Sequence, residues 1–182
     1  MRQGWRDTFS HVILPIVSLI VLVIAKHTRG LSWQDLGLRW PSLRSALLWL
    51  ALFAVLSAGE EIAGKAWGVA APEPWGTKYS IPAVVTRVFA MVVLAPMSEE
   101  LLFRGLLYHL LGASAAGPLG AIAITAAGFA LLHFQYYGPE MLFVALDGLF
   151  YGFARYATGS TLLTMIFHSL GNLYAAYQRV GR

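Results

Sequence analysis

The chain contains no cysteine and few charged residues, and both shortages narrow its class. Without cysteine among its 182 residues, it has no disulfide, no thiolate nucleophile and no sulfur ligand for zinc. Only 12% of the residues are charged and 58% are hydrophobic. That charge fraction is about half of what a soluble domain carries. The composition therefore excludes an ordinary soluble protein and predicts an integral membrane protein.

Several short enzyme motifs are also missing. The sequence has no His-Glu-x-x-His zinc helix, no phosphate-binding glycine loop and no convincing Ser-His-Asp arrangement. A net charge of +4 would suit nucleic acid in a soluble protein. Here, however, basic residues cluster at the ends of apolar segments, where they meet lipid headgroups. We therefore expect a lipid bilayer as a partner, and no nucleic acid.

The apolar segments predict the fold. A membrane-spanning helix needs about 20 apolar residues, so the length allows at most about six or seven such helices. We expect an all-α, polytopic membrane helix bundle of about six to seven transmembrane helices, forming one domain over residues 1–182. Pro96 lacks an N–H and Ser98 can cap a helix, which predicts a break at Pro96-Met97-Ser98. The expected helices cover 9–25, 43–58, 81–97, 99–112, 117–134, 140–157 and 160–178.

Three ionisable residues, Glu99, Glu100 and Arg104, lie close together just after the predicted break. Each charge at bilayer depth costs roughly 2.5–3.5 kcal/mol on insertion, so such residues usually mark a functional site. Glu100 and Arg104 are spaced i and i+4, which places them on one helix face as a buried pair. Glu99 points elsewhere and is free for another partner. The alternative is a salt bridge that serves packing alone.

Other acids of the apolar segments receive different predictions. Glu60, Glu61 and Lys65 repeat the same spacing before a loop rich in proline and tryptophan. We expect their charges to reach water at the membrane interface. Asp147 is a buried acid without an assigned role. Its partner is expected on another helix, because Arg155 lies too far along the same helix.

Two histidines on later segments are natural partners for Glu99. His133 lies at the end of one apolar segment, and His168 shares a helix face with Asn172 on another. A histidine beside an amide can donate hydrogen bonds to an oxyanion formed between helices. Taken singly, each residue is more typical of interhelical packing. Together with an unpaired glutamate, they favour a catalytic site.

Three motifs in this order resemble the CPBP family of intramembrane proteases, which includes CAAX-prenyl proteases and bacteriocin-processing (Abi-type) proteins. The resemblance covers about residues 81–175, the expected catalytic core, and does not extend to the first 80 residues. The motifs are Glu99-Glu100-x-x-x-Arg104, Phe129-x-x-x-His133 and His168-x-x-x-Asn172.

The resemblance implies an intramembrane endopeptidase that hydrolyses a peptide bond in a membrane-associated peptide or protein tail. By motif position, Glu99 would be the general base that activates water, with assistance from His133. His168 and Asn172 would hold the oxyanion, and the buried ion pair would brace the site. The residues with an implied role are Glu99, Glu100, Arg104, His133, His168 and Asn172.

The family has been described both as metalloproteases and as glutamate-type proteases. Glu99, His133 and His168 could bind zinc, but an asparagine beside a histidine suits an oxyanion better than a metal. We therefore expect no cofactor, with zinc as the alternative.

Two other functions stay open. A proton-coupled membrane carrier could use glutamate, histidine and arginine as a proton relay. It should also show paired inverted halves, and the sequence has none. The second is a non-catalytic immunity or scaffold protein on the same fold. The short chain without eukaryotic signals favours the prokaryotic cell (inner) membrane, with bacteriocin leaders, peptide pheromones or sorting tails as substrates.

Overall fold

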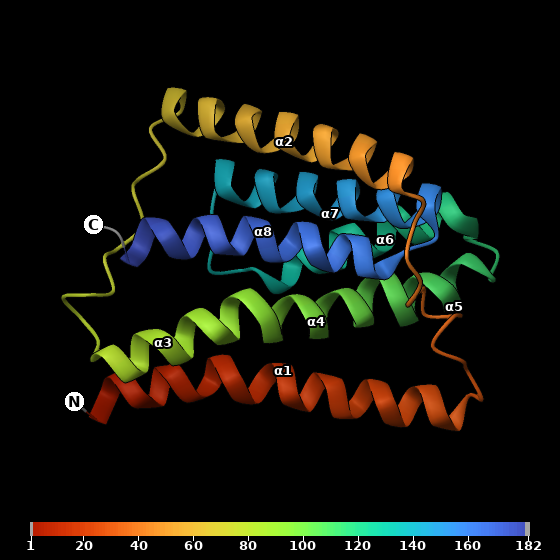
Figure 1. Ribbon diagram of the computed structural model, residues 1–182, viewed down its shortest axis with the longest axis horizontal. Coiled ribbons are helices and arrows are strands. Elements are labelled where there is room, and N and C mark those ends of the chain that lie inside the picture. The colour runs from red at the N-terminus through yellow and green to blue at the C-terminus, as the bar shows by residue number, and fades with distance from the viewer. Residues whose placement is uncertain (1, 181–182) are drawn as a thin grey trace.

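The computed structural model describes residues 2–180, with side chains from residue 8 onward; Met1, Gly181 and Arg182 of the predicted domain lie outside the described residues. Six helices and no strands make up the described part, which confirms the all-α bundle (Figure 1). The third of these helices is continuous from Ile81 to Gly112 and includes two π-helical stretches, η1 and η2. The elements are α1 (Arg2–Thr28), α2 (Leu43–Ala66), α3 (Ile81–Phe89), η1 (Ala90–Leu94), α4 (Ala95–Glu100), η2 (Leu101–Leu107), α5 (Tyr108–Gly112), α6 (Gly117–Leu132), α7 (Pro139–Thr158) and α8 (Thr161–Val180).

The structure has fewer candidate membrane spans than predicted. Within the described residues, three helices are long and apolar enough to cross a membrane: Thr8–Thr28, Leu43–Ala66 and Ile81–Gly112. α6 is apolar but has only 16 residues, which is short for a span. α7 and α8 have 20 residues each, but their charged and polar side chains lower the hydropathy. The protein is thus an integral membrane helix bundle, but the expected six to seven spans were wrong.

The predicted helix break at Pro96-Met97-Ser98 is also wrong, because the helix runs through these residues. The π-helical turn η1 lies just before the proline and widens the helix where Pro96 lacks its N–H. Ser98 does not cap a new helix. Its hydroxyl donates to the Ala95 carbonyl oxygen at 3.0 Å. The two acids that follow therefore lie inside a continuous helix and not in a first turn.

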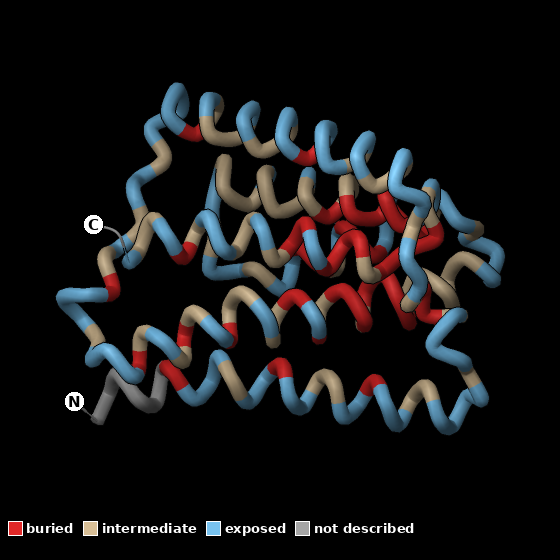
Figure 2. The backbone as a smooth tube through the Cα atoms, in the orientation of Figure 1, coloured by how far each residue is buried: buried red, intermediate tan, exposed pale blue. Residues whose placement is uncertain are grey.

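Consecutive helices α1 and α2 lie on opposite sides of the bundle (Figure 1). α1 packs against α3, η1, α4 and η2, whereas α2 packs against α7 and α8. Both outer helices are largely exposed, and the buried residues gather where the middle helices meet (Figure 2). An apolar yet exposed surface of this kind suits contact with lipid. The candidate site therefore lies in the central layer.

Small residues bring α6 and α7 into close contact. A Cβ atom on Gly152 would lie 2.8 Å from Ile122, and one on Gly148 would lie 3.2 Å from Ala126. Neither position has room for a larger side chain without movement of its neighbour. This close approach holds α6, which carries the Phe129-x-x-x-His133 motif, against α7.

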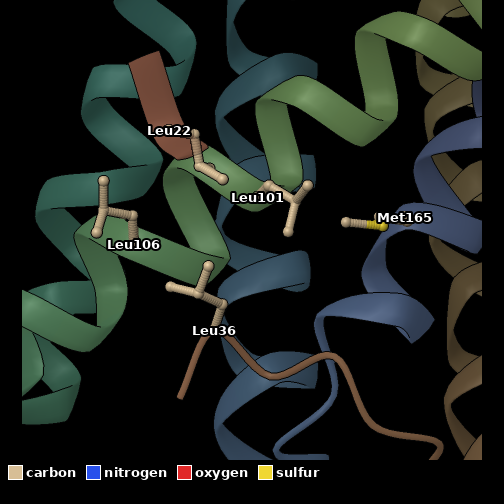
Figure 3. Close-up of a cluster of buried hydrophobic side chains, with 5 residues drawn as sticks. All are labelled: Leu22, Leu36, Leu101, Leu106 and Met165. Carbon is tan, nitrogen blue, oxygen red and sulfur yellow. The ribbon is translucent and has the colours of Figure 1, made fainter. Parts of the chain in front are cut away.

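The segment 29–42 between α1 and α2 contributes Leu36 and Gly37 to the core, whereas most of its other residues are exposed. Leu36 is fully buried and packs in a cluster with Leu22, Leu101, Leu106 and Met165 (Figure 3). The Thr161 hydroxyl donates to the Leu36 carbonyl oxygen at 2.7 Å. This segment therefore joins α1, η2 and α8 at one end of the bundle.

Candidate active site

Glu100 and Arg104 form the buried ion pair that their spacing predicts. Arg104 Nη1 lies 3.1 Å from Glu100 Oε1, and both side chains have an exposed fraction of 0%. Arg104 Nη2 also donates to the Gly148 carbonyl oxygen on α7 at 2.8 Å. The guanidinium lies over the Phe129 ring, 4.6 Å from its centroid. The negative charge of Glu100 is thus balanced where an unpaired carboxylate would be very costly.

Glu99 points away from this pair and toward the two histidines. Its Oε2 atom lies 3.9 Å from His133 Nε2 and 3.9 Å from His168 Nε2. Within the described residues, this buried oxygen has no hydrogen-bond partner. The two separations are longer than direct hydrogen bonds, but one water molecule can contact both atoms of such a pair. The structure thus brings together the three residues that the sequence proposed as partners.

The His168 ring is held on three sides. Its Nδ1 atom lies 3.1 Å from Glu100 Oε1. The Tyr151 ring stacks on the imidazole at 5.5 Å between centroids, with an interplanar angle of 19°. Phe129 meets the imidazole edge to face, with 5.6 Å between centroids. These contacts leave Nε2 facing Glu99.

The second histidine, His133, is oriented by the main chain. Its Nδ1 atom lies 2.8 Å from the Phe129 carbonyl oxygen. Because a carbonyl only accepts hydrogen bonds, Nδ1 carries the hydrogen and donates. In the neutral ring, Nε2 then has a free lone pair directed at Glu99. His133 can therefore accept a hydrogen bond from a water molecule placed beside the glutamate.

Asn172, the last predicted site residue, is half-buried on α8. Its Nδ2 atom donates to the Met91 carbonyl oxygen in η1 at 2.7 Å. The side chain lines the same cavity as His133 and His168. One of its two N–H groups is thus engaged with the main chain, which the sequence did not predict.

Two cavities meet at His133. One, of about 430 Å³, is also lined by His168, Asn172 and Tyr151. The other, of about 490 Å³, is lined by Glu99 and by residues of α1, α4, η2 and the end of α6. Glu99 and His168 therefore line different cavities, and His133 lines both.

The first cavity also contains acids that the sequence did not place there. Glu60 and Asp147 both line it, and Glu60 Oε1 is buried without a hydrogen-bond partner in the described residues. The prediction that the charge of Glu60 reaches water at the interface is therefore wrong for its Oε1 atom. Glu61 does form an ion pair with Lys65, at 3.0 Å. The sequence did contain a signal for the position of Glu60. The spacings of four, three and four place Phe53, Ser57, Glu60 and Gly64 on one helix face, and all four residues line this cavity.

The described part of the chain contains no group of three or more His, Cys, Asp or Glu side chains arranged to hold a metal ion. Zinc, the alternative named from the sequence, would use Glu99, His133 and His168 as ligands, and the expectation of no cofactor stays a prediction.

The fold and the site define a membrane-embedded helical protein with a buried centre of glutamate and histidine. Residues 80–174, more than half of the chain, match the family model described as type II CAAX prenyl endopeptidase Rce1-like. The chain belongs to this Rce1-like family. The match covers all three motifs and confirms the resemblance to CAAX proteases.

A curated relative extends the comparison to bacteria. The chain is 35% identical over 130 residues to a protein of Escherichia coli described as an uncharacterized 24.3 kDa protein. The match covers 66% of this chain and 58% of the relative, so the chain spans less than two thirds of that protein's length. No solved structure matches the chain.

Proposed function

We propose that the protein is an intramembrane endopeptidase that hydrolyses a peptide bond in a membrane-associated peptide or protein tail. The observation that carries this proposal is the convergence of Glu99, His133 and His168, with both 3.9 Å separations meeting at one glutamate oxygen. Membership of the Rce1-like family supports it. The family description also favours C-terminal tails as substrates.

Glu99 is the proposed general base. A water molecule that contacts Glu99 Oε2 and His133 Nε2 is held by two acceptors, so its oxygen lone pair can face a carbonyl carbon. As the water oxygen bonds to that carbon, its proton passes to Glu99. The same proton then passes to the leaving amine nitrogen when the tetrahedral intermediate breaks the C–N bond. The products are a carboxylic acid, which keeps the second proton of the water, and an amine.

His168 is the proposed binding group for the oxyanion. Its Nδ1 contacts the Glu100 carboxylate, which only accepts hydrogen bonds when ionised. Nδ1 therefore carries a hydrogen and donates it to Glu100. Nε2 carries a second hydrogen when the ring is an imidazolium, and the adjacent carboxylate stabilises that positive charge. An Nε2–H aimed into the cavity stabilises charge as it develops on the substrate oxygen.

The proposed location is the prokaryotic cell membrane, with which the Escherichia coli relative is compatible. A peptide bond inside a helix is shielded by the helix's own hydrogen bonds, so the scissile segment must be extended. Short tails next to a lipid anchor or a membrane helix meet this requirement. Bacteriocin leaders, peptide pheromones and sorting tails are the substrate types we propose.

A cleavage assay on the purified protein in liposomes tests the proposed function. We expect one defined bond to be cleaved in a set of membrane-tethered peptides with prenylated and unmodified tails. In ¹⁸O-labelled water, mass spectrometry should find the label in the new carboxylate, because water is the nucleophile. A variant lacking both site histidines, His133→Ala/His168→Ala, serves as the control. Equal cleavage by that variant would contradict the proposal.

Chelation should leave activity unchanged. The proposed base and the oxyanion donor are side chains of this protein, so no step depends on a metal. We expect the same initial rate, within about twofold, before and after dialysis against EDTA and 1,10-phenanthroline. A zinc peptidase treated in the same buffer must lose its activity. A loss that added zinc restores would replace this mechanism with a metal-dependent one.

A further inference from the structure

The π-helical turn η1 leaves one main-chain carbonyl without its usual helical partner. The Ala95 N–H donates to the Ala90 carbonyl oxygen, five residues earlier. The Met91 carbonyl oxygen therefore does not receive Ala95 N–H at the α-helical spacing of four. At the π-helical spacing of five, its partner would be Pro96, which has no N–H. In an apolar environment, an unpaired carbonyl costs about 1–3 kcal/mol.

Asn172 supplies the missing donor from another helix. Its Nδ2 atom lies 2.7 Å from the Met91 carbonyl oxygen, across 81 residues of sequence. α8 packs against η1 and α4, which places the amide beside the widened turn. The proline therefore creates the free acceptor, and the asparagine satisfies it.

This widened turn determines where Glu99 points. A π-helical turn adds one residue to the helical repeat, which rotates everything after it by about 100° relative to an uninterrupted α-helix. Glu99 follows η1 by five residues on the same continuous helix. Without η1, the carboxylate would occupy a different helix face from the one that meets His133 and His168.

We infer that Asn172 is a positioning residue, which donates to the carbonyl that Pro96 leaves free and so holds the π-helical turn that aims Glu99 at the histidines. The activity part of this inference rests on the proposed proteolytic function, whereas the structural part does not. This task differs from oxyanion binding, because the N–H involved is turned to the main chain. The hydrogen bond to the Met91 carbonyl oxygen also explains why a side chain with an N–H group lies one turn after His168.

A double-mutant cycle of Asn172 and Pro96 distinguishes positioning of the π-helical turn from oxyanion binding as the role of Asn172. Asn172→Ala should lower the thermal unfolding temperature in detergent and reduce kcat about tenfold, with KM little changed. Pro96→Ala returns an N–H that can reach the Met91 carbonyl. In the double variant, the loss caused by Asn172→Ala should therefore be largely suppressed, in stability and in kcat. Pro82→Ala, at the exposed start of α3, is the matched proline control and should not suppress it.

Each outcome of the cycle decides the question. Additive stability losses for Asn172→Ala and Pro96→Ala would overturn the inference. So would a double variant that recovers stability but stays as inactive as Asn172→Ala, because the backbone N–H of residue 96 cannot replace an oxyanion donor. If no variant and no wild-type sample cleaves peptides, the proposed function fails, yet the stability coupling still tests the hydrogen bond. Coupling without any activity would support the structural role alone.

Discussion

Replacing Glu99 with glutamine is expected to slow peptide cleavage by about 10²–10⁴-fold, because the amide has nearly the same shape but cannot accept a proton from water. The fold should be unaffected. Glu99 Oε2 has no hydrogen-bond partner within the described residues, so the substitution removes no stabilising contact from that oxygen. Initial cleavage rates in liposomes and thermal unfolding in detergent are the two measurements.

The matched control is Glu73→Gln in the loop before α3. Glu73 is exposed, pairs with Lys78 at 2.8 Å and lines neither cavity, so the loss of its charge should not alter the rate. Glu60 is a poor control, although its sequence context suggested one, because it lines the cavity that reaches His133. Full activity in Glu99→Gln would remove the general base from the mechanism and with it the proposed function.

The second large effect concerns stability. Arg104→Met should destabilise the protein by about 3–5 kcal/mol, since it removes the guanidinium that balances Glu100, a carboxylate with no exposure to solvent, and leaves only the contact with His168. The substitution also removes the hydrogen bond to the Gly148 carbonyl oxygen. Equilibrium unfolding in mixed micelles measures the free energy of unfolding.

A companion variant shows that the buried charge is the cause. Glu100→Gln/Arg104→Met carries no net charge at the pair and should recover much of the loss, although the contact with His168 is weakened. The reference pair is Lys65 and Glu61, which is partly exposed. Lys65→Met there should change stability by no more than about 1 kcal/mol. Equal destabilisation in the single and double variants would contradict this account.

Local spacing was sufficient to predict the ion pair of Glu100 and Arg104 and the different direction of Glu99. The i and i+4 relation of Glu100 and Arg104 survives the π-helical stretch, and their side chains meet at 3.1 Å. The position of Glu99 opposite His133 and His168 was expected from the order of the motifs. Because inserting a carboxylate into the membrane costs free energy, Glu99 needs polar partners, and the later helices contain few polar residues.

The rest could not be predicted, because it depends on contacts between distant helices. Pro96 ends a helix only when the carbonyl that it leaves free stays unsatisfied, and the donor, Asn172, comes from 81 residues after Met91. Glu60 appeared interfacial because its loop is polar. Only the packing of α2 against α7 and α8 turns its helix face toward the cavity.

The segment 29–42 makes contacts that can form only late in synthesis. The Leu36 and Asp35 carbonyl oxygens accept hydrogen bonds from Thr161 and Arg155, residues made 125 and 120 positions later. Arg155 also donates to the carbonyl oxygen of Arg104. A ribosome releases the chain from its N-terminus, so this end of the bundle stays open until α7 and α8 emerge. The glutamates of the nascent protein are therefore made before the histidine of α8, and under the proposed mechanism a chain that stalls before α8 is synthesised cannot cleave peptides.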